Sequence, residues 1–442
     1  MSWEYMVMSV VVGGVALYTV IPDLFLHRLG IGSWKRQYSP GVALTFDDGP
    51  DPAFTPRILD VLKRHHVCAT FFVVAEKAKR YPDLIHQIKD EGHQIGVHSL
   101  NHRYAWFTSP WKTSREWTES VRILETLTED KITWMRPPWG TFNLMTWCWL
   151  KRNKMRAVLW NAEGHDWKVR CSPAEITERI MKGTNEGTIV VLHDSGGEPG
   201  TSENSILALE KLCEQIVHEQ KLPLVPLEFP DWKVRRRLKF RAWEKWEHYY
   251  TRRHCVERID ATNIFRLEKT MYEGPNLYDG ARNLVAKRGD PVVEIHLDNI
   301  RLQAHGQDIQ KTALKVMRQT RESLPVLARY VEDHPMYDNI KVFVAQTLLH
   351  RGVKGFGFHV QDLPDSLKGR GVAWLQKMIM YVYHPAGKKR KKGKLGNKPM
   401  LVWISREELL TMPSPLSESV IAEVPQFSKP RVTCPPEDVQ NA

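Results

Sequence analysis

The chain has 442 residues, of which 42% are hydrophobic and 26% are charged, so it is long enough for two folded domains and is not disordered throughout. Its formal net charge of +12 indicates contact with an anionic surface. No basic segment carries the signature of a nucleic-acid-binding fold, so we expect no nucleic acid partner. The six cysteines include no Cys-x-x-Cys motif, which argues against a disulfide framework or a zinc knuckle.

The chain begins with an uncharged apolar run at residues 6–21. Counting back to Trp3, this run approaches the roughly 20 residues that cross a bilayer. No lysine or arginine precedes the run and no small-x-small cleavage site is obvious, so a cleaved signal peptide fits less well. We therefore expect residues 1–29 to form a transmembrane anchor, with a buried N-terminal helix as the alternative.

Residues 41–230 alternate between strand-like and helical patterns. Strands are expected at 42–46, 69–74, 94–97, 132–136, 157–160, 188–192 and 222–226. Helices are expected at 56–65, 82–91, 114–127, 173–182 and 205–219. This alternation predicts an α/β fold whose parallel strands close into a distorted, TIM-like (β/α)7 barrel. In such barrels the chemistry lies at the carboxyl ends of the strands.

Two adjacent carboxylates, Asp47 and Asp48, follow the first of these strands, and Gly49-Pro50 then forces a turn. Neighbouring residues of an extended segment point in opposite directions, so one carboxylate can bind a metal while the other carries protons. Such pairs also cap turns and helices, and the pair alone does not say which carboxylate does which.

A histidine pair, His98 and His102, follows the strand at 94–97. At a spacing of four residues the two imidazoles share one face of a helical turn and suit the chelation of one divalent ion. An exposed or structural pair is the alternative. Combined with the acid pair at another strand end, the pattern favours a metal site.

Five motifs now stand in order along the chain, and together they resemble the NodB-type polysaccharide deacetylases, the family-four carbohydrate esterases. They span roughly residues 41–230, about half of the chain. The motifs are Thr45-Phe46-Asp47-Asp48-Gly49-Pro50, His98-Ser99-Leu100-Asn101-His102, Arg136-Pro137-Pro138-Trp139-Gly140, Asp166-Trp167 and Val191-Leu192-His193-Asp194. The resemblance implies a barrel that hydrolyses N-acetyl groups from a sugar polymer.

The resemblance also implies a role for each polar motif residue. Asp48, His98 and His102 would hold a divalent metal. We expect zinc, although cobalt, nickel and iron accept the same ligands. Asp47 would be the general base, oriented and kept ionised by Arg136.

On the other side of the scissile amide, His193 would be the general acid that protonates the leaving amine, and Asp166 would hold its imidazole in the required tautomer. Trp167 and Val191 would line a pocket for the acetyl methyl group, and Trp139 would bind substrate. Two residues depart from the family pattern, because Trp139 stands where tyrosine is usual and Val191 where leucine is usual. Neither change removes a metal ligand or a proton carrier.

The second half of the chain is organised differently. Residues 231–254 are basic and aromatic and are expected to form an amphipathic linker helix between a barrel at 38–230 and an α+β domain at 255–411. That domain weakly resembles the YkoP-type domain of some bacterial deacetylases. A Pro- and Ser-rich tail at 412–442 is expected to be disordered.

Within the α+β region, strands are expected at 292–297, 341–345 and 401–404, and helices at 309–333 and 372–383. Glu294 and His296 would share one face of a strand, and we interpret them as a surface pair. The lysine-rich run at 388–394 is interpreted as a solvated loop, with binding of an anionic polymer as the alternative.

These observations lead to the expectation of a membrane-anchored, metal-dependent enzyme that deacetylates peptidoglycan or another N-acetylglucosamine-containing glycan. Anionic wall polymer or lipid headgroups would contact its basic surface. Arg28, Lys35 and Arg36 follow the anchor, which by the positive-inside tendency favours a cytoplasmic barrel. A wall substrate requires an extracellular one, and we follow the substrate. An O-acetyl esterase and an inactive glycan-binding pseudoenzyme are the alternative functions.

Overall fold

The computed structural model describes residues 3–37, 39–229, 234–298, 309–347, 353–363 and 400–411. The helix expected at 372–383, the lysine-rich run at 388–394 and the tail at 412–442 lie outside these residues.

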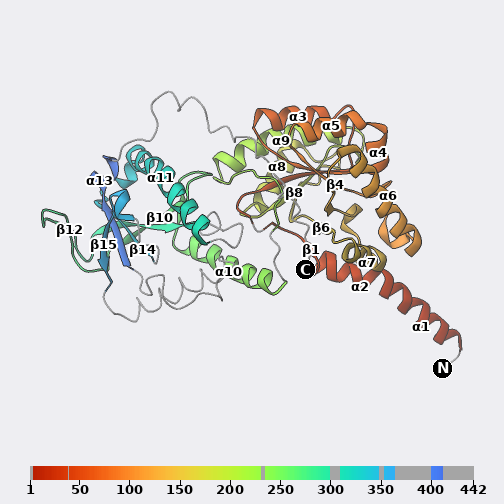
Figure 1. The fold of residues 1–442 in the computed structure, drawn as a ribbon, viewed down its shortest axis with the longest axis horizontal. Coiled ribbons are helices and arrows are strands. Elements are labelled where there is room, and N and C mark those ends of the chain that lie inside the picture. Colours follow the sequence, from red (N-terminus) through yellow and green to blue (C-terminus); the bar gives the residue numbers. More distant parts are fainter. Residues whose placement is uncertain are drawn as a thin grey trace, which may run out of the picture.

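The N-terminal helix projects from the rest of the chain (Figure 1). α1 (Trp3–Val15) continues through a wider turn at Ala16–Val20, α2 (Ile21–Asp23) and a second wider turn at Leu24–Arg28, so the helical stretch has 26 residues. No residue of α1 is buried. By length and composition this helix can cross a membrane. Unlike α1, the last turns of this helical stretch pack against the following domain, where Leu26 is fully buried in the core.

The first domain is built on a curved parallel sheet of eight strands in the order β1-β6-β5-β4-β3-β2-β8-β7. The strands are β1 (Ser33–Trp34), β2 (Ala43–Asp47), β3 (Thr70–Val73), β4 (Gln94–Val97), β5 (Trp134–Met135), β6 (Arg156–Val158), β7 (Ala162–Glu163) and β8 (Ile189–His193). The helices are α3 (Thr55–Arg64), α4 (Ala75–Arg80), α5 (Pro82–Asp90), α6 (Pro110–Thr128), α7 (Leu144–Arg152), α8 (Pro173–Gly183) and α9 (Thr201–His218). The distorted TIM-like barrel is therefore confirmed.

Three strands differ from the expectation. β1 and β7 were not expected, since two residues carry too short a pattern to be recognised. The strand expected at 222–226 is wrong, because only a single bridge joins Leu224 to Val42. Pro223 and Pro226 lack the N–H groups that a longer ladder needs.

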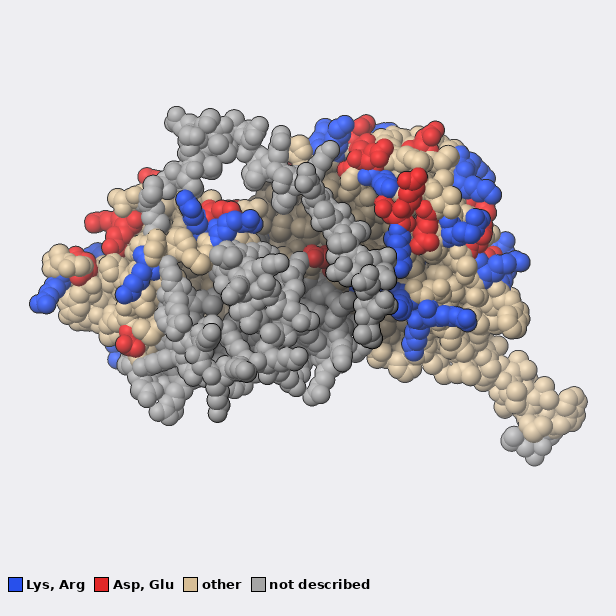
Figure 2. All heavy atoms as spheres, in the orientation of Figure 1, with Lys and Arg blue, Asp and Glu red and all other residues tan. Residues whose placement is uncertain are grey.

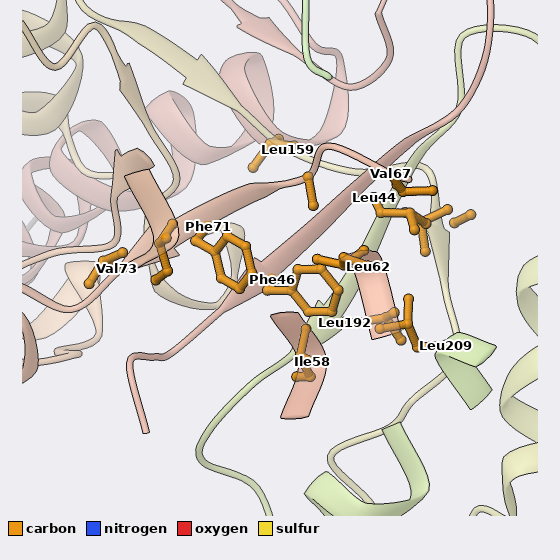
Figure 3. Close-up of a cluster of buried hydrophobic side chains, with 14 of the residues drawn as sticks. Leu44, Phe46, Ile58, Leu62, Val67, Phe71, Val73, Leu159, Leu192 and Leu209 are labelled. Carbon is orange, nitrogen blue, oxygen red and sulfur yellow. The ribbon is translucent and has the colours of Figure 1, made fainter. Parts of the chain in front are cut away.

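The core of this domain lies between the sheet and its helices (Figure 3). Phe46 of β2 stacks on Phe71 of β3 with ring centroids 5.0 Å apart, and Ile58 and Leu209 belong to the same cluster from α3 and α9. Because side chains alternate along a strand, burying Leu44 and Phe46 on the helix side turns Thr45 and Asp47 to the other face.

A second sheet follows in the order β15-β16-β14-β13-β10-β9. Its strands are β9 (Glu257–Arg258), β10 (Phe265–Met271), β13 (Pro291–Leu297), β14 (Val342–Thr347), β15 (His359–Asp362) and β16 (Met400–Ser405), and β11 (Leu277–Tyr278) pairs separately with β12 (Leu284–Ala286). Helices α11 (Ile309–Asp333) and α13 (Arg406–Leu410) share an apolar core with it through Leu327 and Leu409. The expected α+β architecture is confirmed.

α10 (Val234–Arg253) contacts both sheets. Trp243 packs against the cluster that contains Trp34 and Phe229, next to the first sheet. Two turns later, Tyr250 lies edge-on to His296 of β13, with ring centroids 5.9 Å apart. The helix that follows the catalytic half thus contacts both sheets through its aromatic side chains.

Candidate active site

The two proposed proton carriers occupy matching ends of neighbouring strands. Asp47 is the last residue of β2 and His193 is the last residue of β8. The parallel register pairs these two residues directly. Both side chains leave the sheet on the face opposite the helix-side core, at the edge where barrel enzymes place their chemistry.

Arg136 follows β5 and is fully buried beneath this edge. Its Nη1 donates hydrogen bonds to Asp47 Oδ1 and Thr45 Oγ1, each over 2.7 Å. Its Nε and Nη2 donate to the carbonyls of Val158 and Leu159 over 3.1 and 3.2 Å. Four acceptors therefore fix the guanidinium, which in turn holds the Asp47 carboxylate in one orientation.

Asp48, His98 and His102 come together as a compact group. Asp48 Oδ1 lies 3.2 Å from His98 Nε2 and 2.9 Å from His102 Nε2. The two histidines do not share a helical face, so that expectation was wrong. The segment is an irregular loop in which Ser99 and His102 have left-handed φ angles of 76° and 52°. Left-handed backbone at these residues turns the second imidazole back toward the first.

The chemistry of these donor atoms fits a divalent cation. His98 Nδ1 lies 2.7 Å from the carbonyl oxygen of Arg136, and a hydrogen bond donated from Nδ1–H to this oxygen leaves Nε2 turned to Asp48. Within the part of the chain that the structure describes, the buried Asp48 Oδ1 has no hydrogen-bond donor. Burial alone would raise the pKa of the Asp48 carboxyl. The contacts with His102 and His98 outweigh burial and hold this pKa below its usual range, so Asp48 is an anion. One carboxylate and two imidazoles facing one another suit zinc.

His193 is held by a carboxylate that is itself buried. Its Nδ1 lies 2.9 Å from Asp166 Oδ1, and its backbone N–H donates to Asp166 Oδ2 over 2.8 Å. Ser205 of α9 donates to the same oxygen over 2.8 Å. Burial lowers the pKa of His193, but the Asp166 carboxylate outweighs it and, with Asp48 and Asp47 nearby, raises the pKa to about 10. Because Nδ1 contacts Asp166, the other ring nitrogen of His193, Nε2, is left to face the active site.

The three residues expected to contact substrate surround these groups. Trp139 is 51% exposed, has a left-handed φ of 54° and lies against His102 with ring centroids 4.3 Å apart. Trp167 lies edge-on to His193 at 5.3 Å. Val191 is buried two residues before His193 and therefore on the same face of β8. The structure brings all three to the site.

Two polar residues near the acid pair were given no role in the sequence analysis. Lys77 of α4 donates from Nζ to the Asp48 carbonyl oxygen over 2.7 Å and to Ser195 Oγ over 2.6 Å. Asp194 accepts a 2.6 Å hydrogen bond from Thr55, and burial raises the pKa of its carboxyl to about 7. A Cβ at Gly49 would lie 2.0 Å from Asp194 Oδ2, which explains the glycine there.

Only one of these residues could have been found from the sequence. Asp194 stands inside the last motif, directly after His193, so its position was a signal. Lys77 had no signal, because it is one of two lysines in α4 and only the fold brings it under Asp48.

Comparison with known proteins agrees with this geometry. A family model described as polysaccharide deacetylase matches residues 35–158, and a YkoP domain model matches residues 236–412. The chain is 33% identical over 194 residues to a peptidoglycan-N-acetylglucosamine deacetylase of Bacillus cereus, which covers 43% of this chain and 89% of that relative. The chain belongs to the polysaccharide deacetylase family. Its C-terminal part is a YkoP domain.

Other members of the family that resemble the chain have different named substrates. A peptidoglycan-N-acetylmuramic acid deacetylase of Bacillus subtilis is 34% identical over 174 residues, covering 39% of this chain and 36% of that protein. A chitooligosaccharide deacetylase of Sinorhizobium fredii is 33% identical over 157 residues, covering 35% of this chain and 73% of that protein.

A crystal structure of a peptidoglycan N-acetylglucosamine deacetylase is also similar. It is 31% identical, with a TM-score of 0.42, and the match covers 44% of this chain and 90% of that one.

Proposed function

We propose that this protein is a zinc-dependent hydrolase that removes N-acetyl groups from N-acetylglucosamine residues of peptidoglycan. One observation carries the proposal: a carboxylate held by a buried arginine and an imidazole held by a buried carboxylate stand in register on neighbouring strands, beside a metal-binding group. Similarity to named peptidoglycan deacetylases supports the choice of polymer.

The residues divide the hydrolysis between them. Asp48, His98 and His102 would hold the metal, which when bound supplies Lewis acidity to the acetyl carbonyl and to a water molecule. Asp47, oriented by Arg136, takes the proton from the attacking water. His193 donates a proton to the amide nitrogen as the C–N bond breaks, and Asp166 stabilises the imidazolium before that transfer. Acetate and a free amino sugar are the products.

Side chains at the mouth of the site fit a sugar with an acetyl group. Trp139, exposed beside His102, offers an aromatic face to a pyranose ring. Trp167 and Val191 border His193 on the face where the acetyl methyl group would lie. Each deacetylation adds one amine, so the reaction would lower the net negative charge of the polymer.

The N-terminal helix and the rest of the chain extend the proposal to location and organisation. Residues 1–29 would anchor the enzyme in the cell membrane by a single span, with the barrel on the outer side where peptidoglycan lies. The exposed apolar surface of α1 supports this. We further propose a barrel at 38–230, a linker helix at 231–254 and a C-terminal domain at 255–411.

Acetate release by the full-length chain in detergent micelles tests the proposal. N-acetylglucosamine oligomers, intact peptidoglycan and acetylated xylan are offered in parallel, after chelation and again after adding zinc. We expect zinc-dependent release from peptidoglycan that falls by about 10² to 10⁴-fold in Asp47→Asn. The control is Asp60→Asn, an exposed carboxylate of α3.

Each contrary result has a defined meaning. Release that survives Asp47→Asn would contradict the mechanism. Release from acetylated xylan alone would make the enzyme an O-acetyl esterase. Glycan binding without acetate release would make it a pseudoenzyme.

A further inference from the structure

A second group of metal-ligating side chains lies on the other sheet, away from the deacetylase site. β10 and β13 pair in antiparallel register, with Glu268 directly opposite Glu294 and Arg266 directly opposite His296. Residues opposite one another share a face, and so do residues two positions apart along a strand. The register therefore places these four polar side chains on one face. The intervening Leu267 belongs to the apolar core on the other face.

The contacts within this group are short and converge on Glu268. Glu268 is only 6% exposed, and its Oε2 lies 2.8 Å from His296 Nε2. Its Oε1 lies 2.9 Å from Nδ1 of His254, the residue directly after α10. Ligand atoms of Glu268, Glu294 and His296 all lie within 4.8 Å of one another. The ligand atoms of Asp48, His98 and His102 lie within the same 4.8 Å limit.

Two carboxylates directly opposite one another on adjacent strands repel, and a cation between them removes that cost. Arg266, on the same face, also reaches α10, where its Nη2 lies 2.6 Å from Glu247 Oε1. Nitrogen and oxygen ligands of tetrahedral zinc lie roughly 3.4 Å apart, given bond lengths of about 2.1 Å. The 2.8 Å separation between Glu268 Oε2 and His296 Nε2 needs only a small opening to admit the ion.

We propose that Glu268, Glu294 and His296 form a second zinc site, independent of the deacetylase centre. Two carboxylates and one imidazole give zinc three protein ligands, and the partial exposure of His296 leaves a coordination position for water. α10 covers the site, since its Tyr250 donates a 3.1 Å hydrogen bond to Glu268 Oε2 and His254, the residue after α10, contacts the other oxygen. Zinc binding would therefore fasten α10, which also contacts the first sheet, to the second.

The test counts zinc by elemental analysis on the full-length chain in detergent, after equilibration with micromolar zinc and removal of free ion. We expect two zinc ions per wild-type chain and one in His98→Ala/His102→Ala. Glu268→Gln/His296→Ala should also retain one, together with zinc-dependent acetate release within about twofold of wild type. Glu247→Gln is the matched control, because it alters the α10 partner of Arg266 without removing a proposed ligand, and it should retain both.

A second measurement covers variants that fold poorly. Zinc added to the chelator-treated His98→Ala/His102→Ala chain should raise its unfolding temperature, and the rise should disappear when Glu294→Gln is added. A folded His98→Ala/His102→Ala chain that retains no zinc would overturn the proposal. Retention of one zinc ion by the variant that combines His98→Ala/His102→Ala with Glu268→Gln/His296→Ala would also overturn the proposal.

Discussion

At the scale of single residues, the site depends on charges buried far from water. Arg136 and Asp166 are 0% and 1% exposed, and each contacts the side chain that it supports directly, away from bulk solvent. Each is tolerated because every polar atom of its head group meets a partner, among them Thr45 for the arginine and Ser205 for the carboxylate. Removing one partner of such a pair leaves the other charge buried without compensation.

Replacing Arg136 by methionine tests this coupling. We expect Arg136→Met to lower the free energy of unfolding by about 3–5 kcal/mol, because Asp47 stays buried without its cation. Urea denaturation measures the change, and Arg122→Met, which removes an exposed pair with Glu119, is the control. Adding Asp47→Asn should restore part of the stability but no acetate release. A double variant as unstable as Arg136→Met would contradict this account.

The ion pair of His193 predicts a pH dependence of stability in the metal-free chain. Burial lowers the pKa of His193, but Asp166 outweighs it and raises the pKa from 6.5 to about 10. The folded chain therefore holds this proton more tightly than the unfolded chain. The stabilisation is complete below about pH 6.5 and is lost as the pH rises toward 10. Asp166→Asn should flatten this part of the curve.

Urea denaturation at several pH values after chelation gives the comparison. Other groups titrate in the same range, so the informative quantity is the difference between wild type and Asp166→Asn. That difference should shrink as the pH rises. A difference that stays constant would show that Asp166 does not hold the proton on His193.

At the scale of elements, the N-terminal helix is divided between two environments. α1 is exposed along its whole length, whereas the turns after it belong to the barrel. Asp23 accepts a 3.0 Å hydrogen bond from the Phe142 N–H, close to the Trp139 loop, and Tyr18 donates to the Thr108 carbonyl over 2.8 Å. The end of the proposed anchor is therefore also part of the catalytic domain.

Two truncations separate these roles. A chain that begins at Ala16 keeps the docked turns, and a chain that begins at Gly30 loses Leu26 from the core. We expect the Gly30 chain to be less stable than the Ala16 chain by about 2–5 kcal/mol, the range for removing a buried leucine side chain. Thermal and urea unfolding provide the measurement. Equal stability would show that residues 16–28 are not needed by the barrel.

Membrane fractionation of the same chains tests the anchor. The full-length chain should sediment with membranes, and both truncated chains should be released. Sedimentation of the Ala16 chain would place the membrane contact elsewhere. The uncharged surface of α1 on the face shown in Figure 2 fits insertion into lipid.

At the scale of the whole molecule, the two sheets are connected by polar as well as aromatic contacts. Arg258 of β9 lies 2.9 Å from Glu186 of the first domain and 3.2 Å from Asp298 of the second. Lys221, just after the first domain's last helix, donates to the Arg258 carbonyl over 2.7 Å. These contacts, together with α10, predict that the two sheets unfold as one unit.

Differential scanning calorimetry of Arg258→Met tests that prediction. We expect wild type to unfold in a single transition and Arg258→Met to separate into two, because Glu186 and Asp298 would be left buried without this shared cation. The exposed Arg252→Met is the matched control. Two transitions already present in wild type would show that the sheets are energetically independent.

Much of the deacetylase site could be predicted from local sequence. Strand and helix periods alternate along the first half, and that alternation dictates a parallel sheet whose carboxyl ends meet at one edge. Residues such as Asp47 and His193, which end apolar strands, therefore had to approach one another whatever the details of packing. The resemblance to a known family then distinguished base from acid, which spacing alone left open.

Tertiary structure alone decided the features that depend on contacts between distant segments. The loop from His98 to His102 was expected to be helical, yet left-handed turns bring its imidazoles together. Lys77 reaches Asp48 only because α4 packs beside β2's end. Glu294 and His296 were interpreted as a surface pair, and only the pairing of β10 with β13 places Glu268 directly opposite Glu294 on the same face. A sequence period reports the preferences of one segment, whereas strand register and loop conformation are set by what other segments supply.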